Sequence, residues 1–118
     1  DDNTTYMEDF IPLSEEEHKT LDSIVSIINN SIAIPCTSCS YCTKGCPKHI
    51  AIPKYFSLYN NEKMFPTLGF STQKMYYENL TKDYGKASEC IKCGLCEKAC
   101  PQHLKIRDLL QLIAKEFE

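Results

Sequence analysis

The sequence predicts an all-α fold built from two pseudo-symmetric units, each joining a cysteine-rich loop to a helix. Residues 36–53 and 90–107 align at an offset of 54 positions, with four cysteines in register. Hydrophobic residues recur at helical spacing after both loops. No segment shows the sustained alternation of a strand. The length of 118 residues suits a single domain.

The elements before the first loop can be assigned in order. Residues 1–13 are expected to form an extended linker from an upstream domain, because the chain has no initiator methionine and reads as part of a longer protein. Ser14 followed by Glu17 is a capping box and predicts a helix start. The leading helix should lie within 14–34, with an apolar face formed by Leu21, Ile24, Val25, Ile28 and Ile32.

The repeat units are expected over 36–60 and 90–117. Pro53 suits the first turn of a helix that runs to about residue 60. Its inward positions are Ile52, Tyr55, Phe56 and Tyr59. After Pro101 a last helix is predicted, whose apolar positions are Ile106, Leu109, Leu110, Ile113 and Phe117.

The spacer 61–89 is expected to hold a third helix, capped by Ser71 or Thr72 and ending near Gly85. Pro66 and Gly69 break the chain before it. Its large side chains are predicted to be core residues, namely Met64, Met75, Tyr76 and Tyr77.

Composition excludes several classes of protein. No apolar run reaches the ~18–20 residues of a membrane span. The formal charge is −3, and a single arginine with no dense basic stripe argues against nucleic-acid binding. The acidic, polar start of the chain is unlike a signal peptide.

The cysteines carry the strongest signal. All eight fall into two groups of identical spacing, C-x2-C-x2-C-x3-C-P: Cys36, Cys39, Cys42 and Cys46, then Cys90, Cys93, Cys96 and Cys100. Two-residue gaps let three sulfurs turn inward from a tight loop, while the fourth points elsewhere. Zinc usually separates its two cysteine pairs by a longer stretch. Disulfides need an oxidising compartment, and cysteines this close make poor bridges.

This spacing is similar to the run found in bacterial two-cluster ferredoxins. The resemblance implies two [4Fe–4S] clusters, with the fourth cysteine of each run ligating the other cluster. One ligand set is then Cys36, Cys39, Cys42 and Cys100, and the other is Cys90, Cys93, Cys96 and Cys46. Cluster binding should supply folding free energy, so the metal-free chain is expected to be at best partly folded.

The 43 residues between Cys46 and Cys90 distinguish two architectures. Small bacterial ferredoxins join their motifs by a short, strand-bearing stretch, whereas this stretch reads as helical. The chain therefore resembles the alpha-helical ferredoxin-like type, whose members are usually parts of larger redox enzymes.

The whole chain also resembles the C-terminal iron–sulfur extension of a bacterial and archaeal branch of the aldo/keto reductase family. Matching stretches are 7–16, 34–42, 46–53 with Tyr59-Asn60, and 87–102. The resemblance implies an upstream barrel domain carrying the nicotinamide chemistry, with NAD(P)H or flavin bound there or by a partner, and an unidentified redox partner protein. The barrel's catalytic residues are absent, so no catalytic residue is assigned. The cytoplasm of an anaerobic prokaryote is the expected setting.

Two alternatives stay open. One is a structural zinc-binding module, and the other is a helical ferredoxin module of a flavin- or quinone-linked redox complex.

Several residues beside the cysteines invite roles. His49 and His103 occupy equivalent positions and are expected to be surface or capping residues. The resemblance to the aldo/keto reductase branch implies a small residue such as glycine at position 49, so His49 departs from that pattern. Tyr41, Leu95 and Ile91 are expected to shield the clusters. Gly45 and Gly94 are expected to let backbone N–H groups approach the cluster sulfurs, or else simply to form tight turns. The lysines offset cluster charge or form a docking patch, namely Lys44, Lys48, Lys92 and Lys98.

Overall fold

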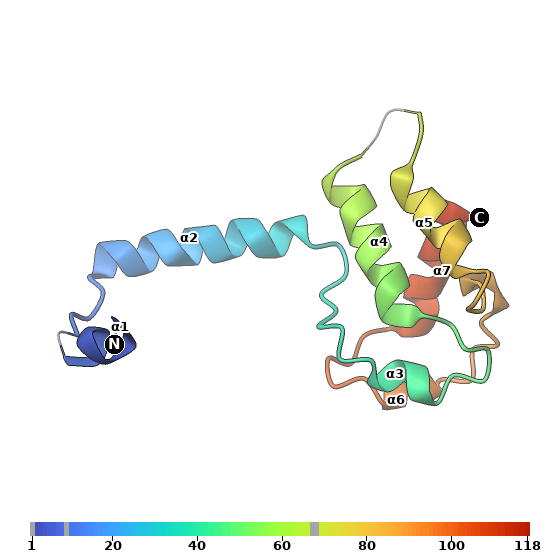
Figure 1. Cartoon of the computed structure of the whole chain (residues 1–118), viewed down its shortest axis with the longest axis horizontal. Helices are drawn as coiled ribbons and strands as arrows, with labels where there is room; N and C mark the ends of the chain where they lie inside the picture. The colour runs from blue at the N-terminus through green and yellow to red at the C-terminus, as the bar shows by residue number, and fades with distance from the viewer. Residues whose placement is uncertain (1, 9, 67–68) are drawn as a thin grey trace. The chain divides into compact units, whose positions relative to one another are not determined.

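The structure is a computed structural model of the chain and describes every residue except 1, 9, 67 and 68. The parts of the expected linker and spacer at those four positions lie outside the described residues. The chain divides into two compact units, Asp1–Ser31 and Ile32–Glu118. The described residues form helices with one isolated bridge between Ile50 and Gly85, which confirms the all-α prediction (Figure 1). None of the described helices is long and apolar enough to cross a membrane.

The first unit holds α1 (Asp2–Glu8) and α2 (Glu15–Ser31). The expectation of an extended linker is wrong for residues 2–8, where no proline or glycine interrupts a helix. The capping box is confirmed. The Glu17 N–H donates to Ser14 Oγ at 3.3 Å, and the Ser14 N–H donates to the Glu17 carboxylate at 2.8 Å. These bonds lower the pKa of Glu17 and open α2 where the sequence predicts.

The predicted apolar stripe on α2 is present but unburied. No residue of this helix is buried. Leu21, Ile24, Val25 and Ile28 lie along it with about half of each side chain exposed. The helix therefore draws no stability from a core, and its first turn depends on the capping box and on three glutamates.

The second unit contains the three longer helices α4 (Ile52–Met64), α5 (Thr72–Leu80) and α7 (Ile106–Phe117). Both α5 and α7 pack against α4. The short helices α3 (Tyr41–Lys44) and α6 (Leu95–Lys98) lie side by side at one end of this group (Figure 1). A 3-10 turn, η1 (Ala87–Glu89), packs on α7.

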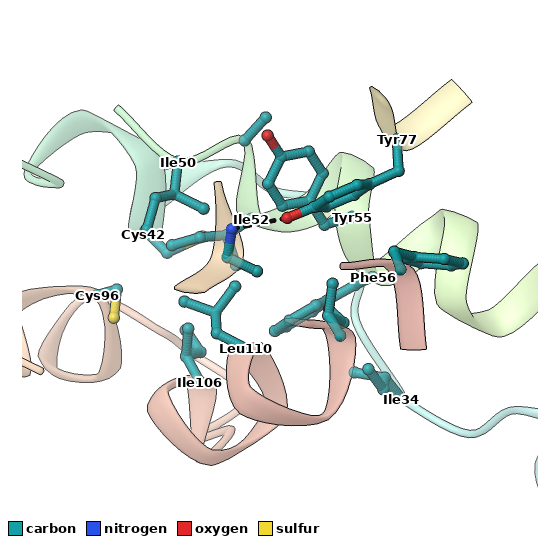
Figure 2. Packing of buried hydrophobic residues seen from close by; sticks show 14 of the residues in the cluster. Ile34, Cys42, Ile50, Ile52, Tyr55, Phe56, Tyr77, Cys96, Ile106 and Leu110 are labelled. Carbon is teal, nitrogen blue, oxygen red and sulfur yellow. Dashed lines mark hydrogen bonds between the residues drawn. The ribbon is translucent and has the colours of Figure 1, made fainter. Parts of the chain in front are cut away.

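The core lies between α4 and α7, as their hydrophobic spacing predicts (Figure 2). Ile52, Tyr55 and Phe56 of α4 are at most 1% exposed. They share one cluster with four buried residues of α7, namely Ile106, Leu110, Ile113 and Phe117. Tyr59 and Leu109, also expected inside, are half-buried at its edge.

The spacer contributes less to the core than expected. Of its four predicted core residues only Tyr77 is buried, with its ring centroid 4.7 Å from that of Tyr55 and 5.3 Å from that of Phe117. Met64, Met75 and Tyr76 are at least 40% exposed, which corrects the prediction. The reason is that α5 covers the helix pair from one side only, so a single aromatic position of its short helix points inward.

The helix boundaries in the spacer are partly as predicted. Ser71 is the N-cap of α5 and accepts a hydrogen bond from the Lys74 N–H at 3.0 Å. The helix ends at Leu80, earlier than expected, and turns bring the chain to Gly85. A Cβ at Gly85 would lie only 2.1 Å from the Lys48 carbonyl oxygen. Glycine is therefore required here for close approach of two backbone segments.

Candidate metal centres

The two cysteine loops repeat in conformation as well as in sequence. Among the residues that the structure describes, five other than glycine have positive φ, and with Gly94 they form three pairs separated by 54 positions: Ser38 and Lys92, Ser40 and Gly94, His49 and His103. The φ values within a pair differ by 15° or less. Left-handed residues reverse the local direction of the chain. Equivalent turns in each loop thus present the cysteines in equivalent ways.

The last of these pairs closes the turn after each fourth cysteine. The His49 N–H donates to the Cys46 carbonyl at 3.0 Å, and the His103 N–H donates to the Cys100 carbonyl at 3.1 Å. Both imidazoles are exposed, so the expectation of surface histidines is confirmed. Their φ values of 50° and 52° lie in the left-handed region, which glycine adopts without strain. Glycine would therefore suit position 49.

Two hollows lie between the loops and the core. The first hollow is lined by Cys36, Cys39, Cys42 and Cys100, and the second by Cys90, Cys93, Cys96 and Cys46. Their volumes, which include the opening to solvent, are about 310 and 320 Å³. Each hollow thus brings together three cysteines of one loop and the fourth of the other. These are the groups that the resemblance implied, although ligation itself stays a prediction.

The chemistry of each hollow fits an iron–sulfur cluster. Four cysteines line each hollow, and thiolates are the ligands that hold [4Fe–4S] clusters. The remaining wall is largely apolar: Pro53, Phe56, Leu104 and Ile106 line the first hollow, and Pro47, Ile50, Ile52, Ile91 and Leu110 line the second. Figure 2 shows Cys42 and Cys96 at the edge of the hydrophobic core. Among the described residues, no three His, Cys, Asp or Glu side chains are arranged to hold a single metal ion.

Burial changes the acidity of the innermost thiols. Burial, together with the smaller effect of the nearby thiols of Cys36, Cys100 and Cys39, raises the pKa of Cys42 to about 11. Burial also raises the pKa of Cys96, with Cys90 adding to the effect. Cysteine binds metal as thiolate, so a bound cation must offset this cost. Cys42 and Cys96 are each 7% exposed, so both side chains are largely shielded from water.

A polar side chain holds the chain just before each loop. Asn60 on α4 accepts from the Ile34 N–H at 2.7 Å and donates to the Ile34 carbonyl at 2.8 Å, two residues before Cys36. The Tyr77 hydroxyl on α5 accepts from the Ala87 N–H at 2.8 Å, three residues before Cys90. Sequence reasoning assigned neither role. In the sequence, Asn60 stands out only because it lies in one of the stretches that resemble the aldo/keto reductase branch.

The roles expected of Tyr41 and Leu95 as shields of the clusters, and of Gly45 in its loop, need correction. Tyr41 and Leu95 are 56% and 47% exposed and lie outside the linings of both hollows, whereas Ile91 lines the second hollow with a 58% exposed side chain. Gly94 has φ +78° and is the N-cap residue immediately before α6, so it forms a tight turn there. Gly45 has φ −102° and does not need to be glycine. The left-handed equivalent of Gly94 is Ser40.

The charged residues near the loops are largely basic. The four lysines singled out from the sequence are all exposed: Lys44, Lys48, Lys92 and Lys98. Glu97 is the one acid in either repeat, 36–53 or 90–107. It is paired with Arg107 at 2.8 Å, and hydrogen bonds from Arg107 lower its pKa.

Comparison with known families gives one match. Residues 35–105, which contain both cysteine loops and the helices between them, match the family model described as a 4Fe-4S dicluster domain. No curated protein and no solved structure matches the chain.

Proposed function

The chain belongs to the 4Fe-4S dicluster domain family, and from that premise we propose that it transfers electrons through two [4Fe–4S] clusters as the C-terminal iron–sulfur domain of an aldo/keto reductase-like oxidoreductase. The observation that carries the proposal is the lining of the two hollows. Each gathers four cysteines from both loops and from no other part of the chain.

The cysteines would bind the clusters, and the apolar wall residues would shield them from water. Cys36, Cys39, Cys42 and Cys100 would hold one cluster, and Cys90, Cys93, Cys96 and Cys46 the other. Each bound cluster supplies a one-electron redox centre. The buried wall residues Phe56 and Leu110, at 0% and 1% exposure, exclude water from the inner side of each hollow. Cys39 and Cys93 are exposed and leave the outer side accessible to a redox partner.

The exchange of the fourth cysteine would also make the sites a structural staple. Cys46 and Cys100 each connect a hollow to the opposite loop. Binding at either site therefore ties residues more than 40 positions apart in sequence. This supports the expectation that the metal-free chain is partly folded at best.

The reductase parent rests on the sequence stretches that resemble that family. The exposed apolar residues of the first unit support it, because large apolar side chains are usually covered by a partner surface. Tyr6, Met7, Phe10 and Ile11 are each more than 70% exposed. An upstream barrel domain would cover such residues. It would also supply the site for NAD(P)H or flavin, which would then exchange electrons with the clusters.

The test is metal and sulfide analysis of protein purified without oxygen. We expect about eight iron and eight sulfide per chain, from two four-iron clusters, with visible absorption that bleaches on adding dithionite. Colourless protein with two zinc ions per chain would overturn the proposal and establish the zinc module instead. Sequencing the gene upstream of the codon for residue 1 tests the proposed aldo/keto reductase parent separately. A flavin- or quinone-linked domain encoded there would overturn that part of the proposal.

A further inference from the structure

Two short helices present exposed side chains at the cysteine-loop end of the second unit. α3 and α6 lie side by side (Figure 1), and a Cβ placed on Gly45 would lie 4.0 Å from Leu95 Cβ. Residues three apart share one side of a helix, so Tyr41 lies with Lys44 on α3 and Leu95 lies with Lys98 on α6. All four are exposed. These four residues form the α3–α6 face.

The α3–α6 face and the two hollows lie on opposite sides of the same short helices. Cys42, the second residue of α3, is 7% exposed and lines the first hollow. Cys96 has the same place in α6, is equally buried and lines the second hollow. Only one short helix therefore stands between each hollow and the solvent at this face. A protein seated there would approach both candidate cluster sites.

The centre of the α3–α6 face is apolar. Tyr41 and Leu95 are 56% and 47% exposed and line neither hollow, so they serve no cluster directly. Large apolar side chains exposed together are typical of an interaction surface. Two such side chains make a small centre, which suits the low-area, transient interfaces of electron-transfer complexes. The face therefore favours a brief encounter over a permanent assembly.

The segments that contain this face are basic. Residues 36–54 and 86–108 hold eight lysine or arginine residues and three acids, for a formal charge of +5. The other residues of the chain carry −8, since the whole chain carries −3. The count includes Glu89 and Glu97 beside the second loop, and Glu97 is paired with Arg107 at 2.8 Å. Positive charge is thus concentrated at the loop end of a chain that is acidic elsewhere.

Bound clusters would offset much of this charge in sum, but not at the surface. An oxidised four-iron cluster with its four thiolates carries about −2, so two would bring about −4. That charge would lie in the hollows, behind α3 and α6, whereas Lys44 and Lys98 are exposed on the outer side. Salt screens charges beyond about 8 Å under physiological conditions. A partner at the face therefore meets the lysines first.

From these features we propose that the α3–α6 face docks an acidic one-electron carrier protein. Lys44 and Lys98 attract carboxylates at the rim of the carrier, and Tyr41 and Leu95 contact its apolar centre. One electron then passes from a reduced cluster to the oxidised centre of the carrier, and no bond forms or breaks. The proposal rests on the proposed function and adds the kind of partner and the place where it binds.

The probe is cytochrome b5, an acidic haem protein that accepts one electron, and the basic cytochrome c is its counterpart. Stopped-flow absorbance of each haem follows its reduction by the dithionite-reduced, cluster-loaded chain after excess dithionite is removed. Rising salt should slow the reduction of cytochrome b5 and should not slow that of cytochrome c. Titration calorimetry of the oxidised chain measures the binding of cytochrome b5 with no electron transferred.

Charge reversal at the face is the decisive change. Lys44→Glu and Lys98→Glu should each weaken the binding of cytochrome b5 and slow its reduction by about three- to tenfold at low salt. Lys115→Glu is the matched control, because Lys115 is exposed in the last turn of α7, away from α3 and α6 (Figure 1). It should change either quantity less than about twofold. Leu95→Ser should weaken binding by about two- to fivefold without altering its dependence on salt.

Iron per chain is measured for every variant, and rates are expressed per reduced cluster. Reduction of cytochrome b5 that quickens with salt, or equal responses to Lys98→Glu and Lys115→Glu, would overturn the proposal. So would a dimer of the loaded chain in sedimentation that Lys98→Glu separates, because the face would then belong to a second copy. Absence of iron from the unmodified chain would instead overturn the proposed function, so the two failures are distinguishable.

Discussion

The side-chain amide of Asn60 binds both backbone groups of Ile34, accepting from its N–H at 2.7 Å and donating to its carbonyl at 2.8 Å. Ile34 is 1% exposed, and Cys36 follows two residues later. A single residue of α4 therefore fixes where the first cysteine loop begins.

Asn60→Ala should destabilise the loaded protein by about 1–3 kcal/mol, because it leaves two partly buried backbone groups without partners. Loss of iron on chelator challenge should also quicken, first from the site of Cys36. Thermal unfolding and timed iron release measure the two effects. Asn61→Ala is the control, since Asn61 is exposed, and it should change neither. Equal effects of Asn60→Ala and Asn61→Ala would refute the stabilising role of the two hydrogen bonds between Asn60 and Ile34.

Gly85→Ala should disrupt the packing behind Cys46. The added methyl group would meet the Lys48 carbonyl oxygen at 2.1 Å, which forces apart the segments joined by the Ile50–Gly85 bridge. Overpacking of this kind costs about 1–3 kcal/mol.

Gly45→Ala provides the comparison for this prediction. It lies closer in sequence to the cysteines, but its φ is −102° and its Cβ would meet Leu95 Cβ at an ordinary 4.0 Å. We expect wild-type stability from Gly45→Ala in chemical denaturation. If the alanine at position 45 proved the more harmful of the two, the close approach at Gly85 would be wrong.

Replacing His49 by glycine should stabilise the loaded protein by about 0.5–1 kcal/mol. A left-handed residue with a Cβ carries ~1–2 kcal/mol of strain, which glycine relieves at some cost in chain entropy. His49→Val should have the opposite sign, because a β-branched residue tolerates positive φ least. The same pair of substitutions at His103 should behave alike. Denaturation midpoints decide this, and a loss of stability with glycine at both positions would contradict the prediction.

Alkaline pH should weaken the fold through Tyr55. Burial raises the pKa of Tyr55 to about 12 from an ordinary value of 10, and its hydroxyl donates to the Gly85 carbonyl at 2.9 Å. The folded state thus holds this proton more tightly than the unfolded state. Its contribution is complete below pH 10 and is lost as pH rises toward 12.

Tyrosinate absorbance and circular dichroism followed from pH 9 to 12 measure this effect. Tyr55→Phe should be less stable at neutral pH, because the Gly85 carbonyl loses its donor, and its stability should fall less steeply above pH 10. An unchanged slope in Tyr55→Phe would show that Tyr55 does not contribute to the alkaline transition.

Much of the helical framework could be predicted because it depends on local patterns. The capping box at Ser14 and the N-cap at Ser71 follow from adjacent side chains. The inward faces of α4 and α7 follow from helical spacing. The identical spacing of the two cysteine groups predicts two four-cysteine sites. The structure gathers the eight cysteines into two hollows, with four cysteines lining each.

The remainder depends on contacts that no local pattern encodes. The amphipathic spacer indicated a buried face, but only the packing of α5 on α4 selects Tyr77 over Tyr76. The left-handed turn at His49 lacks the glycine that would have marked it. The requirement for Gly85 comes from Lys48, 37 residues away in sequence. Residues 2–8 form a helix although their polar composition is equally compatible with an extended linker, so composition alone does not distinguish the two states.

The exchange of the fourth cysteine is the central claim, and Cys100→Ser tests it most directly. Electron paramagnetic resonance of the reduced, loaded variant should be compared with that of Cys39→Ser and of Cys93→Ser, which mark the signals of the two sites. We predict that Cys100→Ser alters the same signal as Cys39→Ser and leaves the signal marked by Cys93→Ser intact. A change confined to the signal marked by Cys93→Ser would contradict the account, since Cys100 would then serve its own loop.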